Sequence, residues 1–233
     1  MIYYTPKQVQ DYIKREMKPT KEYNGRSRIR MYLGDCIDLM KSKPENYWQL
    51  SIVDPPYGIN ASGMVMGKGK NKKWDKSKDW DNNTPDKYYF KTLEDSSNNQ
   101  IIWGGNYFNL PISRGWIFWD KGLNGKSSFS DGELAWTSFD MVLRKANVRY
   151  DGFLGADKQR IHPTQKPVQL YKWLLTNYAK QGDTILDTHG GSMSIAIACW
   201  DLGFDLDIIE LDEDYFNDAV KRFEQHISQT QLF

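Results

Sequence analysis

Residues 51–58 read SIVDPPYG, and this stretch decides how the first half of the chain folds. The apolar run from Gln49 to Val53 has the composition of a buried strand, and it ends at Asp54. The two prolines that follow have a fixed φ and no backbone N–H, so the strand cannot continue through them. We therefore expect the Asp54 carboxylate to stand at the carboxyl end of a buried strand.

Strand and helix patterns alternate on both sides of this stretch. A strand pattern from Arg28 to Leu33 and a helix pattern from Cys36 to Lys43 precede it, which gives a strand, helix, strand unit. The last third of the chain continues the alternation, with a helix over 167–179, a strand over 184–187, a helix over 192–202, a strand over 206–210 and a helix over 213–226. This order predicts an α/β fold with helices on both faces of a mixed, mostly parallel sheet.

The middle of the chain has a different composition. Glycine, lysine, asparagine and aspartate dominate residues 60–83, which predicts a long loop. Apolar runs at 100–105 and 115–120 predict two strands, and the runs at 133–139 and 141–146 predict a hairpin. We expect these strands to form a second part of the sheet.

Composition limits the classes of protein that remain. A length of 233 residues fits one domain, 1–233, and 31 Lys and Arg balance 30 Asp and Glu, so an anionic partner must bind a local basic patch. Cys36, Cys199 and three histidines lack ligand-like spacing, and we expect no metal site. The N-terminus has no signal-peptide pattern and no window is apolar enough to cross a membrane, which predicts a cytoplasmic protein.

The late strand at 184–187 ends in a glycine-rich turn. Asp187 is followed by Gly190, Gly191 and Ser192, and a backbone without side chains lets a ligand approach the start of the next helix. Glu210 ends the following strand, where a carboxylate can accept both hydroxyls of a ribose. The turn therefore predicts a nucleotide-type cofactor site, although glycines that serve only chain reversal are the alternative.

Taken together, these motifs resemble the amino-methylating DNA methyltransferases of the β group, whose motif order is circularly permuted. Asp54–Tyr57 reads DPPY, which is the catalytic motif of that family, and residues 162–167 read HPTQKP, which is similar to the stretch ahead of its cofactor strand. Residues 187–194 read DTHGGSMS and depart from the family's DPFxGSGT at His189 and Met193, which bears on cofactor affinity more than on fold. The matches span about residues 30–225 and imply a Rossmann-like methyltransferase fold.

The resemblance also implies a cofactor and the residues that bind it. The cofactor of this family is S-adenosylmethionine. The positions that match its binding motifs are Asp35, His162, Thr164, Lys166, Asp187, Gly190, Gly191, Ser192 and Glu210.

The catalytic motif suits attack by an exocyclic amine, which is a poor nucleophile because its lone pair is delocalised into the ring. The Asp54 carboxylate and the Pro55 carbonyl can accept its protons, and Pro55 and Pro56 keep that carbonyl turned outward. Tyr57 can stack on a base rotated out of the duplex. Taken alone, DPPY is also compatible with a strand-ending turn that has a capping Asp.

Three functions follow from this resemblance. The DPPY form is commoner among enzymes that methylate adenine N6, so we expect a DNA adenine-N6 methyltransferase. Methylation of cytosine N4 is the alternative within the same fold. A catalytically idle DNA-binding relative, whose altered loop no longer holds the cofactor, is the third.

DNA contact and partners are also open to prediction. Residues 61–80 carry six lysines against two aspartates, and Lys68, Lys70, Lys72 and Lys73 are expected to contact double-stranded DNA. A solvated loop without a partner is the alternative.

Residues 121–160 occupy the position of the family's target-recognition segment. The resemblance also suggests a homodimer, and the C-terminal QTQLF at 229–233 resembles a peptide that docks on bacterial sliding clamps. A bacterial or phage-infected cell, with or without a restriction partner, fits these features.

Overall fold

The structure, a computed structural model, describes residues 16–59, 81–123, 130–150, 161–162 and 164–230. The strands are β1 (Lys21–Asn24), β2 (Arg28–Leu33), β3 (Trp48–Val53), β4 (Ser97–Trp103), β5 (Trp116–Asp120), β6 (Gly132–Thr137), β7 (Arg144–Asn147), β8 (Thr184–Asp187) and β9 (Asp205–Glu210). The helices are α2 (Cys36–Lys41), α3 (Lys87–Ser96), the 3-10 turn η3 (Gly105–Tyr107), α4 (Val168–Tyr178), α5 (Ser194–Leu202) and α6 (Glu213–Thr230).

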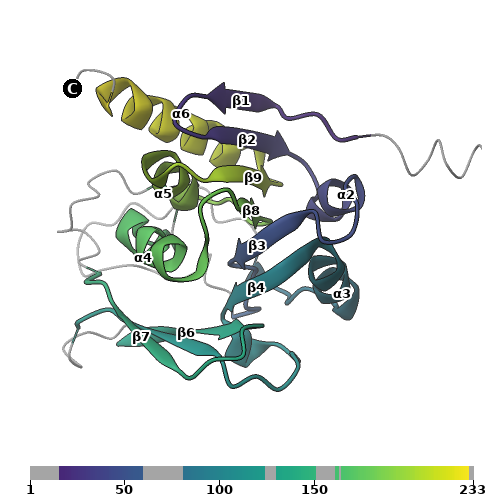
Figure 1. Ribbon diagram of the computed structural model, residues 1–233, viewed down its shortest axis with the longest axis vertical. Coiled ribbons are helices and arrows are strands. Elements are labelled where there is room, and N and C mark those ends of the chain that lie inside the picture. The colour runs from purple at the N-terminus through teal and green to yellow at the C-terminus, as the bar shows by residue number, and fades with distance from the viewer. Residues whose placement is uncertain (1–15, 60–80, 124–129, 151–160, 163, 231–233) are drawn as a thin grey trace, which may run out of the picture.

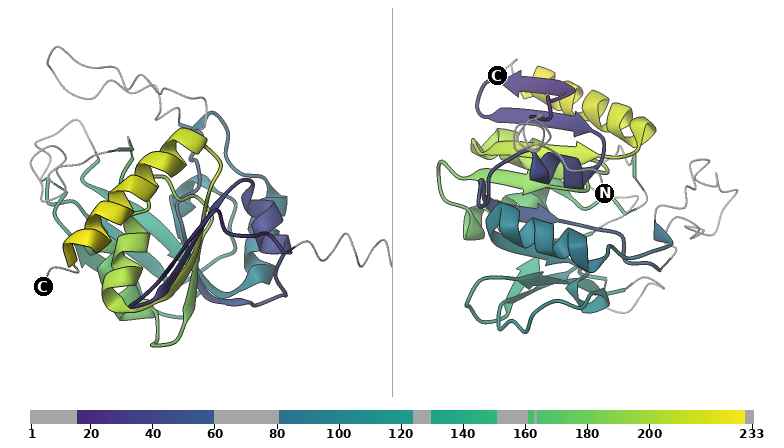
Figure 2. Two further views of the ribbon diagram at one scale, coloured as in Figure 1. Left: turned by 90° about the horizontal axis from the view of Figure 1, so that it is seen from above. Right: turned by 90° about the vertical axis from the view of Figure 1, so that its right-hand side faces the viewer.

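All of these strands belong to one sheet in the order β1-β2-β9-β8-β3-β4-β6-β5-β7. The five strands from β2 to β4 in this order are parallel, while β1 and β6 run antiparallel to their neighbours. Helices α2 and α3 cover one face, and α4, α5 and α6 cover the other (Figures 1 and 2). The expected Rossmann-like fold with helices on both faces of a mixed, mostly parallel sheet is confirmed.

Two apolar cores fill the space between the sheet and its helices. One lies under α4, α5 and α6, and the other lies under α2 and α3. Every residue of α5 from Ser194 to Trp200 is buried, which explains why this helix is apolar on all sides and not only along one stripe. Helix α5, which follows the glycine turn, is therefore held in place by packing on every side.

One predicted pairing is wrong. Residues 133–139 and 141–146 do not form a hairpin; β6 lies between β4 and β5 and pairs antiparallel with both, while β7 pairs parallel with the other side of β5. A hairpin is the local solution for two neighbouring apolar runs. Here β6 gains two strand partners instead of one, which satisfies the hydrogen bonds of both its edges.

The topology brings the strand-ending acids to one edge of the sheet. Asp54 follows the last residue of β3, Asp187 ends β8 and Glu210 ends β9, and these three strands are consecutive parallel neighbours in the order β9-β8-β3. Ligands in open α/β sheets bind at the carboxyl ends of parallel strands. The residues that the sequence separates by more than 150 positions therefore line one side of the molecule.

Candidate active site

The DPPY turn is held in place by an aspartate from the next described segment. Asp81 Oδ1 accepts the backbone N–H groups of Tyr57 at 2.7 Å and of Gly58 at 3.0 Å. Asp81 is buried, with 1% of its surface exposed. No sequence motif pointed to Asp81, because its contact depends on where the chain returns after residue 80.

Tyr57 closes over the carboxylate that precedes it. Its hydroxyl donates to Asp54 Oδ1 at 2.6 Å, and its ring stacks on Tyr107 with centroids 5.0 Å apart and planes at 12°. Gly104 has a φ of +67°, and a Cβ there would lie 2.2 Å from the Tyr57 ring. A glycine is therefore required at the end of β4 for the Tyr57 ring to take this position.

Tyr107 was not expected from the sequence. It stands in η3 and is 48% exposed, so the aromatic pair lies at the surface of the molecule. The pair offers two parallel rings beside Asp54, which is the chemistry that stacks on a nucleobase.

Lys166 lies at the DPPY turn. Its Nζ is 2.5 Å from Asp54 Oδ2, 3.3 Å from the Tyr57 hydroxyl and 3.2 Å from Glu133 Oε2. Glu133 Oε1 in turn pairs with Lys121 Nζ at 2.7 Å. The resemblance placed Lys166 with the cofactor residues, whereas the structure brings it to the Asp54 carboxylate.

Burial and charge oppose each other at this cluster. Burial raises the pKa of Asp54 above its usual value, because it outweighs the Lys166 ammonium, which lowers that pKa. For Glu133 the lysines outweigh burial, and Lys166 and Lys121 lower its pKa to about 2. Burial disfavours the Lys166 ammonium, but Asp54 and Glu133 outweigh this effect and raise the pKa of Lys166. Glu133 and Lys166 are therefore charged at neutral pH.

The glycine turn after β8 is held by Glu210. Glu210 Oε2 accepts the N–H of Gly191 at 2.7 Å, and its Oε1 accepts the N–H of Asp212 at 2.8 Å. Asp187 Oδ1 accepts the N–H of His189 at 3.0 Å, and burial raises the pKa of Asp187 to about 8. The expected residues Asp187 and Glu210 thus both accept backbone N–H groups of the turn that contains Gly190 and Gly191.

Met193, which departs from the family pattern, also has an unusual backbone conformation. Met193 has a φ of +52°, a left-handed conformation that favours glycine. Its side chain is 1% exposed and packs into the core, so burial offsets the backbone strain. Arg222 from α6 donates to the Ser192 carbonyl at 2.7 Å and to Ser194 Oγ at 3.1 Å, which ties the loop to the last helix.

The departure at His189 belongs to a buried chain of hydrogen bonds. The Tyr89 hydroxyl lies 2.7 Å from Thr188 Oγ1, which lies 2.9 Å from His189 Nδ1. Burial lowers the pKa of His189 to about 4, so the imidazole is neutral at pH 7. These hydrogen bonds connect the turn after β8 to α3.

The remaining expected cofactor residues lie at two places. His162 packs edge-on against Tyr215 with centroids 4.5 Å apart, its Nδ1 lies 3.1 Å from Thr164 Oγ1, and its ring lies next to Gly191. Asp35 is exposed and caps α2 by accepting from the N–H of Ile37 at 2.7 Å. The preceding Gly34 donates to the Glu210 carbonyl at 3.0 Å, which keeps Asp35 near the glycine turn.

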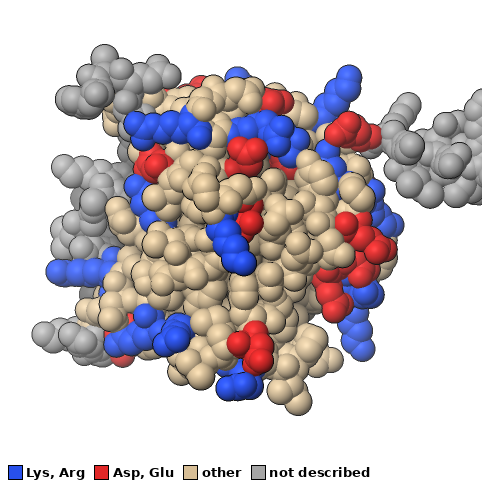
Figure 3. Space-filling model, viewed as in Figure 1, with Lys and Arg blue, Asp and Glu red and all other residues tan. Residues whose placement is uncertain are grey.

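Several predictions fall on residues outside the described ranges. These are Lys68, Lys70, Lys72 and Lys73, the parts 124–129 and 151–160 of the recognition segment, and residues 231–233 of QTQLF. The face of the molecule in Figure 3 mixes basic and acidic side chains, in keeping with the balanced composition. Among the described residues there is no group of three His, Cys, Asp or Glu that would hold a metal ion, and no described helix has the length and apolar character of a membrane span.

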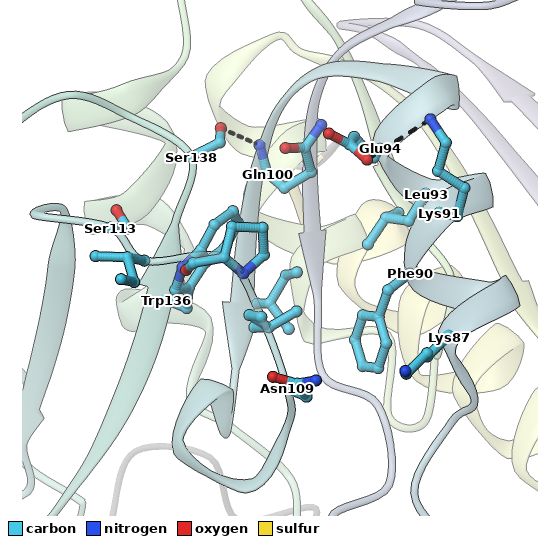
Figure 4. Close-up of a pocket in the computed structure, with 14 residues that line it drawn as sticks. Lys87, Phe90, Lys91, Leu93, Glu94, Gln100, Asn109, Ser113, Trp136 and Ser138 are labelled. Carbon is cyan, nitrogen blue, oxygen red and sulfur yellow. Dashed lines mark hydrogen bonds and ion pairs between the residues drawn. The ribbon is translucent and has the colours of Figure 1, made fainter.

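A separate pocket of about 570 Å³ lies between α3 and β6. Phe90 and Lys87 line it from the helix, Trp136 lines it from β6, and Asn109 and Ser113 belong to the connecting segment (Figure 4). None of the site residues described above lines this pocket. The acids and glycines at the carboxyl edge of the sheet therefore remain the candidate site.

Comparisons with known proteins agree with this geometry. The family model N6_N4_Mtase, described as DNA methylase, matches residues 102–221, which is 120 of the 233 residues. The chain is similar in structure to the M1.HpyAVI–SAM complex, with 19% identity, a TM-score of 0.53, and coverage of 83% of this chain and 99% of that chain. It is also similar to the PvuII DNA methyltransferase (cytosine-N4-specific), with 14% identity, a TM-score of 0.54, and coverage of 92% and 93%. At these identities the two structures support the fold.

Proposed function

Because the chain belongs to the N6/N4 DNA methylase family, we propose that it transfers a methyl group from S-adenosylmethionine to the exocyclic N6 of adenine in DNA. The observation that carries the proposal is the Asp54 carboxylate, which stands at the end of β3 beside the glycine turn of β8. The family match begins at residue 102, so the catalytic role of Asp54 is supported by its own geometry and motif.

The residues at the glycine turn fit S-adenosylmethionine. Gly190 and Gly191 leave backbone accessible, and a Cβ on Gly190 would come within 3.3 Å of Ile208, Met193 and the Ile209 carbonyl. Glu210 uses each oxygen once and keeps further lone pairs for ribose hydroxyls. Asp187 and Glu210 add carboxyl oxygens, which can accept hydrogen bonds from the polar groups of the cofactor. When bound, this cofactor supplies the methyl group.

The residues of the DPPY turn would then act on the acceptor base. The Asp54 carboxylate and the Pro55 carbonyl orient the amine protons so that the nitrogen lone pair faces the methyl group. In the structure, Tyr57 and Lys166 each donate to one oxygen of Asp54, and each oxygen has a second lone pair for the incoming amine. Tyr57 and Tyr107 provide the stacking surface for a base rotated out of the duplex.

The proposal is tested by incubating the protein with DNA and methyl-labelled S-adenosylmethionine and identifying the modified nucleoside by mass spectrometry. We expect N6-methyladenine. N4-methylcytosine would correct the acceptor within the same family, whereas no labelled nucleoside together with no cofactor binding by calorimetry would support the idle DNA-binding alternative. If the DNA carries no methyl label although the cofactor binds normally, other acceptor molecules should be tested.

We also propose that the lysine-rich segment at 61–80 contacts DNA phosphates, since it follows the catalytic turn and carries a local surplus of positive charge. Replacing Lys68, Lys70, Lys72 and Lys73 by Ala should weaken DNA binding and make the slope of log K against log salt shallower by about 3 to 4. Fluorescence anisotropy at several salt concentrations measures both effects. An unchanged slope would remove this segment from the DNA interface.

The predictions for the other partners remain proposals. The described part of 121–160 includes β6 and β7, which belong to the sheet, so we assign target recognition within this segment to the residues outside those strands. A homodimer and docking of QTQLF on a sliding clamp are further predictions; sedimentation with and without a purified clamp would test both.

A further inference from the structure

Four charged side chains form a cluster beside the DPPY turn. They come from four places in the fold: Asp54 from the end of β3, Lys121 from the end of β5, Glu133 from β6 and Lys166 from the segment before α4. The Lys166 side chain is 4% exposed, and those of Lys121, Asp54 and Glu133 are 11%, 18% and 25% exposed. Two carboxylates are thus matched by two ammonium groups in a place largely shielded from water.

Both lysines pair with Glu133, and Lys166 also pairs with Asp54. Lys121 is paired with Glu133 at 2.7 Å, while Lys166 bridges Asp54 at 2.5 Å and Glu133 at 3.2 Å. Lys166 is the one lysine or arginine within 4 Å of the Asp54 carboxylate among the described residues. If Lys166 were neutral, Glu133 would keep Lys121 and Asp54 would have no cation. A buried carboxylate without a cation takes up a proton.

We propose that Lys166 is a positioning residue for methyl transfer, which keeps Asp54 ionised and fixes its Oδ2. This inference rests on the proposed function, because it concerns the state in which Asp54 meets the acceptor amine. Lys166 acts through Asp54 and need not touch the base.

An ionised carboxylate matters because the acceptor amine brings only N–H donors. The ionised form of Asp54 has acceptor lone pairs alone, whereas the protonated form presents an O–H that competes with the amine. The Tyr57 hydroxyl and the Lys166 ammonium already fix the orientation of the two oxygens. An acceptor that is charged and oriented before the base arrives needs no rearrangement during the reaction.

The pH dependence must include every titratable group around Asp54. Burial and the negative charge of Glu133 raise the pKa of Asp54 above its usual value, although Lys166 and the Tyr57 hydroxyl lower it. Electrostatic effects also connect Asp54 with Asp187 at the end of β8, Tyr171 in α4 and Tyr89 in α3. Removing Lys166 and removing Glu133 should therefore move the pKa of Asp54 in opposite directions.

Lys166→Met should move the acidic limb of the kcat/KM profile to higher pH by about 1 to 3 units, which is the range for loss of an opposite charge within 4 Å of a carboxylate. Glu133→Gln should move the same limb to lower pH or leave it in place. Lys166→Arg keeps the charge and should restore most of the wild-type profile. Cofactor affinity measured by calorimetry should change much less than kcat/KM in all three variants.

Lys172→Met is the matched control, because Lys172 also pairs with an aspartate, Asp201, at 2.6 Å, but on α4 and α5. Its pH profile should coincide with that of the wild type. A loss of activity in Lys166→Met that is equal at every pH would overturn the proposal, as would a shift to higher pH in Glu133→Gln.

A second measurement separates this proposal from the proposed function. Carbon-13 NMR of the labelled Asp54 carboxyl reports its protonation without any substrate. A titration midpoint that rises in Lys166→Met and not in Lys172→Met supports the role of Lys166 even if DNA is not the acceptor. A midpoint that is the same in wild type and Lys166→Met overturns the inference even if the wild type methylates adenine. If Lys166→Met does not fold, Lys166→Gln and Glu133→Gln provide the same comparison.

Discussion

Asp54→Ala should lower the rate of methyl transfer by roughly 10³-fold or more, because it removes the acceptor that orients the amine in the transition state. Single-turnover transfer of a labelled methyl group measures this loss. Cofactor affinity should stay within about threefold of the wild-type value, since Asp54 makes none of the contacts that hold the glycine turn. The effect should therefore appear in the chemical step.

Asp54→Asn tests the same role with the side-chain volume unchanged. The amide offers one acceptor oxygen and a donor group, so it cannot accept from both Tyr57 and Lys166 and from the amine. We expect a loss close to that of Asp54→Ala. Lys166 keeps Glu133 as a partner in both variants, which limits the cost to folding. Activity within about tenfold of the wild type in Asp54→Ala would contradict the mechanism.

The second large effect concerns stability and is centred on Asp207 in β9. Asp207 is fully buried and accepts from Arg30 Nε at 2.5 Å, Arg30 Nη2 at 2.6 Å, Trp48 Nε1 at 2.9 Å and the Tyr32 hydroxyl at 3.3 Å. Asp207→Ala leaves a guanidinium and two further donors without this acceptor. The free energy of unfolding should fall by about 3 to 5 kcal/mol, as it does when one partner of a buried ion pair is removed.

Urea denaturation followed by tryptophan fluorescence measures this change. Asp140→Ala is the control, because Asp140 pairs with Arg114 on the surface and its side chain is 85% exposed; its midpoint should match that of the wild type. The double variant Arg30→Met, Asp207→Leu should recover much of the lost stability, since it removes both charges together. A midpoint for Asp207→Ala equal to that of Asp140→Ala would show that the buried pair does not stabilise the fold.

The sequence predicted the parts of this protein whose signals are local. The strand that ends at Asp54, the strand that ends at Asp187 and the glycines after it each have a pattern of apolar residues closed by a residue that stops the strand. These patterns predicted which residues lie at the carboxyl edge of the sheet, including most of the candidate cofactor residues. They rest on short-range chemistry, which is present in the order of the residues.

Other features depend on contacts that no local pattern encodes. Glu133 reaches Lys166 only because β6 lies between β4 and β5, and the sequence favoured a hairpin there. Asp81 reaches the DPPY turn across a segment of more than 20 residues. The contact of Lys166 with Asp54 was not predicted for the same reason, since the two residues are 112 positions apart.

The pairing of Asp54 with Lys166 has a consequence for folding. The two residues are 112 positions apart, so their contact closes a long loop, whereas Gly191 and Glu210 are 19 positions apart in one strand, helix, strand unit. Long-range contacts form more slowly because more chain entropy is lost before they gain stability. The glycine turn can assemble within the C-terminal part of the chain, but the Asp54 carboxylate contacts Lys166 only after both halves of the sheet have joined. Completion of the candidate catalytic centre is thus tied to completion of the whole fold.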